Sequence, residues 1–280
     1  MQFSEKELKL FSQIGYKNEC KFTANSIKDT LKNSKRLKNQ FEFQIYLQGS
    51  YKNQTNTYSS DIDIIVQLRK LLNRDISTNI DNERINTWKF FKQEIKEELN
   101  SKYGENNVSI GNKSIKLSTP YLYSEVDVVP CLEGYKYNYS HDKVYEAVNF
   151  WTNEETRLIT SFPKLHYRNG LIKNRNTNKL YKPTVRMFKT LRVYLIENNI
   201  IKKEDISSYF IECILFNVPD SLYFKKYSKR ILYIIYFLKS TNLKHFMHQH
   251  MNSKLLGNTP EQLSFLKAKK FIQKLDNFIN

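Results

Sequence analysis

The stretch LQGSYKNQTNTYSSDIDIIVQL, residues 47–68, decides the fold class of this chain. A Gly-Ser pair follows an apolar segment, a polar loop comes next, and Asp61 and Asp63 then alternate with apolar residues. Aspartate is a poor strand former, and a strand this apolar is expected to be buried. Side chains alternate across a strand, so the two carboxylates would share one face. Because neighbouring carboxylates repel each other, the pattern favours a bound divalent cation.

A third carboxylate follows in EVDVV, residues 125–129, which is typical of another strand. Asp127 stands between two valines that would pack on the opposite face. Glu125 shares the face of Asp127 but lies further out, so Asp127 ranks above it. Three carboxylates on adjacent strands can hold two Mg²⁺ ions about 4 Å apart, with Mn²⁺ as a substitute. Such a pair activates an attacking hydroxyl and neutralises a leaving pyrophosphate.

The Gly49-Ser50 pair gains a role beside such a site. Because glycine has no Cβ, the backbone at Gly49 can approach phosphate oxygens closely, and the Ser50 hydroxyl and nearby amides can donate hydrogen bonds to them. The competing interpretation is structural: Asp61 would cap a turn, and Asp63 would form a buried ion pair with a lysine. That interpretation leaves Gly49, Ser50 and Asp127 unexplained, so the sequence favours a metal-dependent phosphate site.

Composition agrees with a polyanionic ligand. The chain has 280 residues, with 45 Lys and Arg against 28 Asp and Glu, a formal net charge of +17. This charge predicts attraction to nucleoside triphosphates or nucleic acid, although a compositional bias toward Lys, Asn and Ile would produce it without a binding role. Three isolated cysteines, with no C-x-x-C pair and no nearby His at zinc-ligand spacing, predict reduced thiols in an intracellular protein.

No targeting or membrane segment is expected. The N-terminus is charged from its fourth residue and has no apolar core of a signal peptide, and the longest apolar run, 231–238, falls short of the roughly 20 residues of a membrane span. A cytoplasmic protein without a membrane partner is therefore predicted.

Periodicity predicts an α/β (α+β) part built around a mixed sheet. Alternation predicts strands at 41–48 and 61–68, and a strand at 124–130 that Pro130 would end. Residues 108–118 are typical of a hairpin. Apolar residues every three or four positions predict a helix over 84–99 that lies on the sheet.

Helical periodicity dominates after about residue 151. Helices are predicted from Pro183 to about Glu197 and within 206–218 and 229–239. The expected domains are an N-terminal helical segment packing across both lobes (1–40), a catalytic lobe (41–150) and a helical lobe (151–280), with the active-site cleft between the lobes. On the Pro183 helix, Lys182, Arg186 and Lys189 are spaced to share one face.

Gly-Ser, a gap of ten residues, Asp-x-Asp and a later Asp resemble the signature of the polymerase-β-like nucleotidyltransferases. Within that superfamily the chain is similar to the bacterial cGAS/DncV-like nucleotidyltransferases, the CD-NTases of CBASS antiphage defence, and most to their clade E (CdnE). The further stretches that carry this resemblance are VDVVP, FPKLHYRNG, YKPTVRMFKTLR and SSYFIECILFNVP, and the resemblance as a whole spans about residues 12–219.

The resemblance implies a polymerase-β-like catalytic lobe followed by an OAS-like helical lobe, and an enzyme that makes a cyclic dinucleotide second messenger. Two ribonucleoside triphosphates (ATP, GTP or UTP) would be condensed with loss of pyrophosphate, and a downstream effector protein would read the product. Asp61 and Asp63 would ligate both metals, and Asp127 would ligate the catalytic metal and help to activate the attacking hydroxyl.

The resemblance also implies nucleotide-binding residues. Gln48, Gly49 and Ser50 would lie on the phosphates. In the helical lobe Lys189 would contact the triphosphate, unless it is a solvated lysine of a basic helix.

Ser208 would donate to the same triphosphate, and Tyr209 would stack on the donor base, unless it packs in the core. Asn169 would contact a base and is associated with pyrimidine use, unless Asn169-Gly170 is an ordinary turn. A UMP-containing product, cyclic di-GMP and other purine products all stay open.

Two other functions are considered. In the first, the chain is still a nucleotidyltransferase, but the acceptor is an RNA or protein hydroxyl. In the second, the chain is a nucleic-acid-binding module that acts through its positive charge. A nucleic-acid activator is left open as well. His245, His248 and His250 lack a neighbouring cysteine or carboxylate, so a solvated helix end is expected there rather than a metal site.

Overall fold

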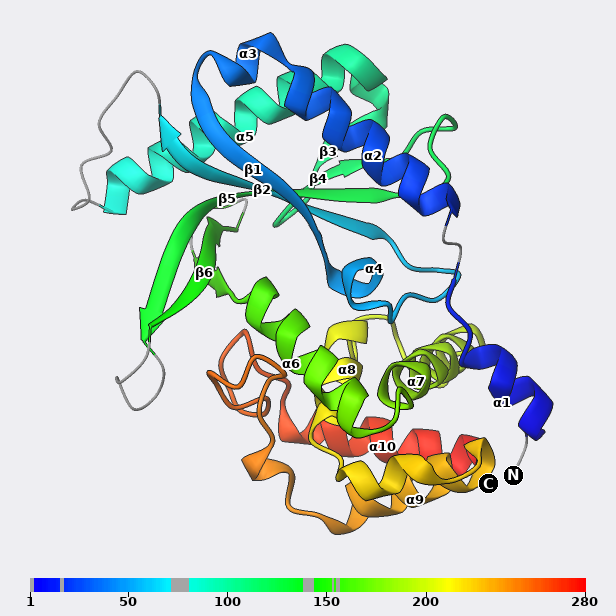
Figure 1. The fold of residues 1–280 in the computed structure, drawn as a ribbon. Coiled ribbons are helices and arrows are strands. Elements are labelled where there is room, and N and C mark those ends of the chain that lie inside the picture. Colours follow the sequence, from blue (N-terminus) through cyan, green and yellow to red (C-terminus); the bar gives the residue numbers. More distant parts are fainter. Residues whose placement is uncertain (1–2, 16–17, 72–80, 138–143, 153, 155–156) are drawn as a thin grey trace. The chain divides into compact units, whose positions relative to one another are not determined.

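The computed structural model describes residues 3–15, 18–71, 81–137, 144–152, 154 and 157–280. The chain forms two compact units (Figure 1). The helical unit consists of Met1–Gly15, Asn53–Tyr58 and Leu165–Asn280, and the sheet unit of Tyr16–Lys52 and Ser59–Lys164. In the described part of the chain, no helix is long and apolar enough to cross a membrane.

A single mixed sheet forms the core of the sheet unit. Its strands are β1 (Phe41–Gln48), β2 (Ile62–Leu71), β3 (Val108–Ile110), β4 (Ile115–Leu117), β5 (Val126–Tyr137), β6 (Val144–Trp151) and β7 (Leu158–Ser161). The order is β1-β2-β5-β4-β3, and β6 pairs with both β5 and β7. Among the described strands of this sheet, β2 and β5 pair in parallel and the other pairs are antiparallel. The predicted fold class, first two strands and β3-β4 hairpin are confirmed.

The expectation that Pro130 ends its strand is wrong, because β5 continues to Tyr137. Pairing of β4 with β5 stops at Val128, and pairing of β6 with β5 begins at Leu132. Pro130 therefore lies in a gap between two partners on that edge, where its missing N–H removes no ladder hydrogen bond. On the other edge it still pairs with Val66 of β2.

Helices cover the sheet (Figure 1). They are α2 (Asn18–Asn33), α3 (Lys35–Lys38) and α5 (Asp81–Tyr103), with the short α4 (Gly49–Asn53) after β1 and a 3-10 turn, η1 (Glu105–Asn107). On α5, Trp88, Phe91 and Ile95 are essentially fully buried, which confirms the predicted sheet-covering helix. The Trp88 indole N–H donates to the Pro130 carbonyl at 2.8 Å, which satisfies a polar group within this core.

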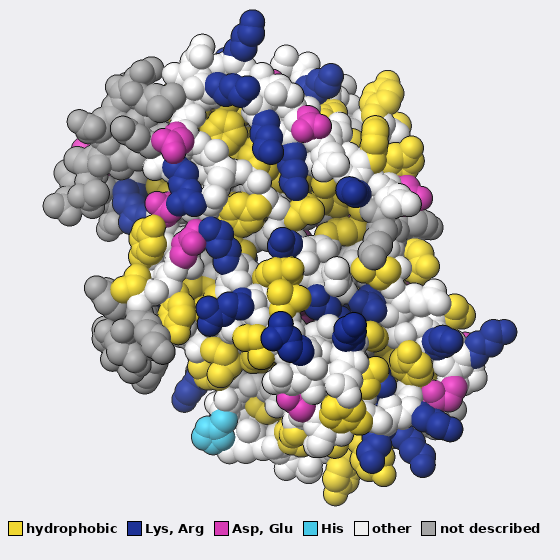
Figure 2. Space-filling model, viewed as in Figure 1, with side chains coloured by type: hydrophobic (Ala, Val, Ile, Leu, Met, Phe, Trp, Pro, Cys, Tyr) yellow, Lys and Arg dark blue, Asp and Glu magenta, His cyan; other side chains and the backbone are white. Residues whose placement is uncertain are grey.

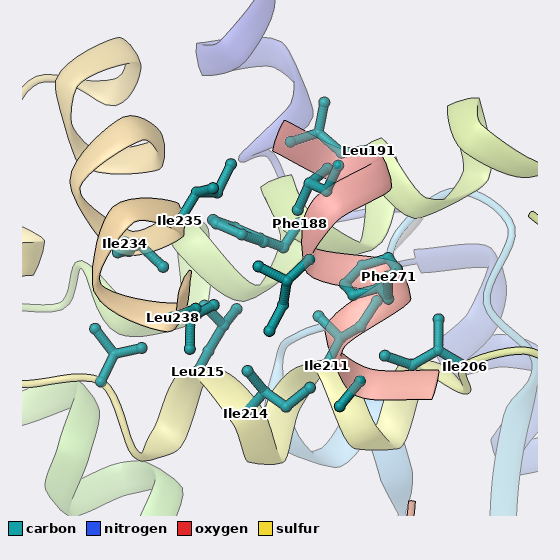
Figure 3. Packing of buried hydrophobic residues seen from close by; sticks show 14 of the residues in the cluster. Phe188, Leu191, Ile206, Ile211, Ile214, Leu215, Ile234, Ile235, Leu238 and Phe271 are labelled. Carbon is teal, nitrogen blue, oxygen red and sulfur yellow. The ribbon is translucent and has the colours of Figure 1, made fainter. Parts of the chain in front are cut away.

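The helical unit packs its helices around a second core. They are α1 (Glu5–Phe11), α6 (Pro163–Asn176), α7 (Tyr181–Glu197), α8 (Ser208–Phe216), α9 (Tyr227–Ser240) and α10 (Phe265–Ile279), with 3-10 turns η2 (Asp220–Phe224) and η3 (Leu243–His245). Figure 3 shows Phe188 of α7, Ile211 and Leu215 of α8, Ile235 of α9 and Phe271 of α10 converging. The three helices predicted after Pro183 are confirmed.

Candidate active site

Two of the three predicted carboxylates lie at the same level of neighbouring strands. Asp63 of β2 and Asp127 of β5 are register partners in the parallel pair. The Asp127 Oδ1 accepts a hydrogen bond of 2.9 Å from the Ser114 hydroxyl, which orients the carboxylate. Asp61 is exposed and comes directly before β2, which begins at Ile62. The sheet thus brings Asp63 and Asp127 together, and Asp61 adjoins them along the chain.

The Gly-Ser turn lies against Asp63. Gln48 ends β1 and pairs with Asp63, and Gly49 then opens α4 with φ of +63°. A Cβ at position 49 would overlap the Asp63 carboxylate, so both the backbone conformation and the close approach require glycine. Ser50 is half-buried in the same turn. Residues 48–50 and the two carboxylates therefore meet at one end of the central strands.

The donor set at this end fits a hard divalent cation, because carboxylate oxygens are what Mg²⁺ binds. The Asp63 carboxylate occupies the space that a side chain on residue 49 would fill, so it lies beside open glycine backbone. Within the described ranges, no three His, Cys, Asp or Glu side chains already converge as metal ligands. The assignment of Asp61, Asp63 and Asp127 as ligands is therefore a proposal.

A buried carboxylate organises the helical unit. Glu212 of α8 is 3% exposed and accepts hydrogen bonds from Asn53 Nδ2 at 2.9 Å, Thr55 Oγ1 at 2.8 Å and Lys189 Nζ at 3.0 Å. His166 Nε2 lies 3.2 Å from Glu212 Oε1, the oxygen that also accepts from Asn53. Burial alone would raise the pKa of Glu212, but the Lys189 ammonium, followed by His166, holds this pKa well below its usual range. Glu212 is therefore a fully paired buried anion.

The basic face of α7 points at residues 53–58. Lys182 Nζ donates to Gln54 Oε1 at 3.3 Å, Arg186 donates to the Gln54 carbonyl, and Lys189 Nζ also contacts Thr55. The predicted common face of the three cations is confirmed. The interpretation of Lys189 as a solvated lysine is wrong, since it is 4% exposed and its ammonium is paired with Glu212. Its role as a phosphate contact stays a prediction.

Ser208 and Tyr209 begin α8, one turn before Glu212. Ser208 is exposed, and Tyr209 retains 41% of its surface, so simple core packing does not account for Tyr209. The Tyr209 ring stacks on His166, with centroids 5.4 Å apart and planes at 26°. Its hydroxyl lies 3.0 Å from His248 Nδ1. The ring is held from two sides and still reaches the surface.

Asn169 lies in the middle of α6, so the alternative of an Asn-Gly turn is wrong. Its Nδ2 donates to the Gln249 carbonyl at 2.8 Å. The expectation of a solvated helix end holds for His245, which is exposed at the end of η3, and is wrong for His248 and His250, which are buried. The chain leaves helical structure after η3, and these two imidazoles stack on each other, with centroids 5.0 Å apart.

Sequence reasoning missed Glu212 and assigned no role to His166. A signal was present for the first: Glu212 is a lone carboxylate inside the apolar run FIECILF. A charge inside such a helix requires a buried partner. His166 carried no comparable signal, because its partner lies 46 positions away in the sequence.

The positive charge is concentrated in one unit. The helical unit contains 23 Lys and Arg against 9 Asp and Glu, a net +14, whereas the sheet unit contains 22 against 19, a net +3. Figure 2 shows many Lys and Arg side chains on the face in view, with few Asp and Glu among them. A field of this sign attracts polyanions such as nucleoside triphosphates.

Comparisons with known families and proteins agree with this geometry. Residues 27–216 match the nucleotidyltransferase domain, and residues 168–280 match the cGAS/DncV-like nucleotidyltransferase C-terminal helical domain. The cyclic UMP-AMP synthase of Rhodothermus marinus is 37% identical over 288 residues, which cover 99% of this chain and 98% of that protein. The cyclic nucleotide synthase CdnE01 of Staphylococcus haemolyticus is 36% identical, with 100% and 99% covered.

Solved structures give the same picture. The Rhodothermus marinus CdnE c-UMP-AMP synthase with Apcpp and Upnpp superposes with a TM-score of 0.85 at 35% identity, covering 99% of this chain and 96% of that one. The Elizabethkingia meningoseptica CdnE cyclic dinucleotide synthase with GTP and Apcpp gives 0.83 at 26% identity, with both chains fully covered. The similarity therefore continues past residue 219, where the resemblance in the motifs ends.

Proposed function

The chain belongs to the cGAS/DncV-like nucleotidyltransferase family, and we propose that it condenses two ribonucleoside triphosphates into a cyclic dinucleotide with release of pyrophosphate. Relatives that match along its whole length are named as cyclic nucleotide synthases. The observation in this chain that carries the proposal is the register of Asp63 with Asp127 beside Gly49. The motif that predicts nucleotidyl transfer is thereby assembled at one end of the sheet.

In nucleotidyl transfer the protein contributes mainly by positioning the reactants and stabilising charge. A ribose hydroxyl attacks an α-phosphorus in line with the leaving pyrophosphate, and no side chain needs to form a covalent bond to the substrate. Asp127, oriented by Ser114, would help to take the proton of the attacking hydroxyl. Gln48, Gly49 and Ser50 would bind phosphate oxygens.

In the helical unit, Lys189 and Ser208 would bind the triphosphate tail. The Lys189 ammonium forms an ion pair with Glu212. When a triphosphate binds, Lys189 would either contact the phosphate and Glu212 together or leave Glu212 for the phosphate. Tyr209 would stack on the donor base, and Asn169 would contact a base edge. The net +14 of this unit supports the assignment of the triphosphate to it.

Divalent metal is part of the proposal. Asp61, Asp63 and Asp127 would hold two Mg²⁺ ions, or Mn²⁺ in their place. When bound, such ions neutralise phosphate charge and lower the pKa of an attacking hydroxyl. Chelation with EDTA should abolish product formation, and added Mg²⁺ should restore it.

The product is open between pyrimidine-containing and purine dinucleotides. Named relatives include a cyclic UMP-AMP synthase, cyclic dipyrimidine synthases and a cyclic dipurine synthase. We place the chain in the cytoplasm, in antiphage signalling of the CBASS type, with a cyclic-dinucleotide effector protein downstream.

One experiment tests the proposal. The purified protein is incubated with Mg²⁺ or Mn²⁺ and all four ribonucleoside triphosphates, treated with phosphatase, and its products are identified by mass spectrometry. A phosphatase-resistant cyclic product should form and should be lost in Asp61→Asn/Asp63→Asn. Asp29→Asn, which neutralises an exposed carboxylate on α2, is the matched control and should retain activity. Equal product from the double variant would refute the carboxylate assignment.

The same assay separates the alternatives. An enzyme that modifies an RNA or protein hydroxyl should make no small cyclic product from nucleotides alone. A basic nucleic-acid-binding module should bind nucleic acid in a salt-sensitive way that survives both aspartate substitutions.

A further inference from the structure

The loop of residues 246–252, here the histidine loop, holds buried polar side chains that the proposed reaction does not use. His248, Gln249 and His250 are 3%, 1% and 8% exposed. The Asn217 side chain anchors the loop, accepting from the Met247 N–H at 2.9 Å and donating to the Met247 carbonyl at 2.7 Å. This loop is therefore a fixed part of the helical unit.

His248 holds the Tyr209 ring. Burial, followed by the charge of His166, lowers the pKa of His248 to about 4, so its imidazole is neutral at pH 7. A neutral imidazole with its proton on Nε2 accepts at Nδ1, and the Tyr209 hydroxyl lies 3.0 Å from that atom. With the stack on His166, this bond fixes both the plane of the Tyr209 ring and its rotation in that plane.

Gln249 holds Asn169 and His166. The Gln249 backbone carbonyl accepts from Asn169 Nδ2 at 2.8 Å, and the Gln249 side chain donates to the His166 carbonyl at 2.8 Å. A carbonyl oxygen can only accept, so the amide nitrogen of Asn169 must face it, and Oδ1 of Asn169 is turned the other way. Gly170 makes room for the side chain of Gln249, because a Cβ at residue 170 would lie 2.5 Å from Gln249 Nε2.

We propose that the histidine loop is a positioning element for nucleotide binding, in which His248 fixes Tyr209 as a stacking surface for a base and Gln249 presents Asn169 Oδ1 as a hydrogen-bond acceptor. The inference rests on the proposed function, since it takes Tyr209 and Asn169 as base contacts. It assigns His248 as a positioning residue that acts through Tyr209. A base edge that meets Asn169 Oδ1 would have to carry an N–H donor.

The test is equilibrium binding of non-hydrolysable imidotriphosphate analogues of ATP and UTP, with KM and kcat for synthesis measured in parallel. His248→Phe keeps an aromatic ring but removes the acceptor. It should weaken binding of at least one analogue and raise the matching KM about three- to tenfold, with kcat within about twofold. His248→Asn returns an acceptor near the position of Nδ1 and should restore binding to within about twofold. His245→Phe, an exposed histidine of the same sequence run, is the matched control and should bind as the wild type does.

A double-mutant cycle makes the test specific. Tyr209→Phe removes the other end of the same hydrogen bond, so the double variant with His248→Phe should bind no more weakly than either single variant. Additive losses, or a lower melting temperature with unchanged binding, would overturn the inference. Weakened binding in a protein that makes no cyclic product would overturn only the proposed function, and a wild type that binds neither analogue would overturn both.

Discussion

Replacement of Glu212 by Gln should strongly destabilise the helical unit. Glu212 and Lys189 form an ion pair of 3.0 Å with side chains only 4% and 5% exposed, and Glu212→Gln leaves the Lys189 charge buried with a neutral partner. Removing one member of a buried pair costs about 3–5 kcal/mol. Because Gln retains one acceptor, we expect the lower end, about 3 kcal/mol. For a chain of this size this corresponds to a fall in melting temperature of roughly 6–12 °C.

Two spectroscopic probes and a double-mutant cycle test whether the lost Glu212–Lys189 pair causes the destabilisation. Both tryptophans, Trp88 and Trp151, lie in the sheet unit, so their fluorescence follows that unit, whereas far-UV circular dichroism weights the helices. Glu212→Gln should lower the dichroism transition more than the fluorescence transition. Lys189→Met combined with Glu212→Gln should be less destabilised than the sum of the single variants. Glu197→Gln, an exposed glutamate at the end of α7, is the control and should change stability by less than about 0.5 kcal/mol.

The pH dependence has a definite sign. The folded pKa of Glu212 is depressed below the usual 4.5, so its contribution to stability is complete above about pH 4.5 and is lost as the pH falls through the folded value. The stability gap between wild type and Glu212→Gln should therefore stay constant from pH 7 to about pH 5 and narrow below that. A gap below 1 °C at pH 7, or one that widens on acidification, would refute the reasoning.

Three further substitutions follow from the sheet unit. In Gly49→Ala, the alanine must adopt the left-handed conformation of residue 49, which costs about 1–2 kcal/mol, and its Cβ displaces the Asp63 carboxylate. Formation of cyclic product should therefore fall by about 100-fold or more, while the midpoint of thermal unfolding followed by fluorescence moves by only a few degrees. Near-normal synthesis would contradict the packing argument. Ser114→Ala removes the hydroxyl that orients Asp127 and should lower kcat about three- to tenfold with melting temperature unchanged, whereas an effect on KM alone would disagree. Trp88→Phe loses the indole N–H bond to a β5 carbonyl and some buried volume, so urea unfolding should show a loss of about 1–3 kcal/mol, and an unchanged midpoint would show that the bond is dispensable.

Local patterns predicted the elements that carry the chemistry. The alternation around Asp63 predicted β2, and the three- to four-residue period of α5 predicted a helix on the sheet; both signals are local and depend on which face is buried. The family resemblance rested on the same short stretches. That the chain is a nucleotidyltransferase was therefore predictable before any tertiary contact was known.

The features that could not be predicted from the sequence depend on contacts between distant segments. Asn53 reaches Glu212 across 159 positions, and His248 reaches Tyr209 across 39, so neither pairing has a local signature. Pro130 was expected to end β5 because a proline lacks a ladder donor, but the gap between β4 and β6 removes that cost. The register of Asp63 with Asp127 likewise depends on a parallel pairing across more than sixty residues.

The division of the chain into units has a consequence for protein engineering. Residues 53–58 belong to the helical unit although they lie more than a hundred positions before its main segment, which starts at Leu165. A fragment of residues 165–280, expressed alone, would lack Asn53 and Thr55, and its buried Glu212 would lose two of its donors. Such a fragment is expected to be unstable even though most of its hydrophobic core is present. A soluble excised version would need residues 53–58 supplied as a grafted loop that restores the Asn53 and Thr55 donors to Glu212.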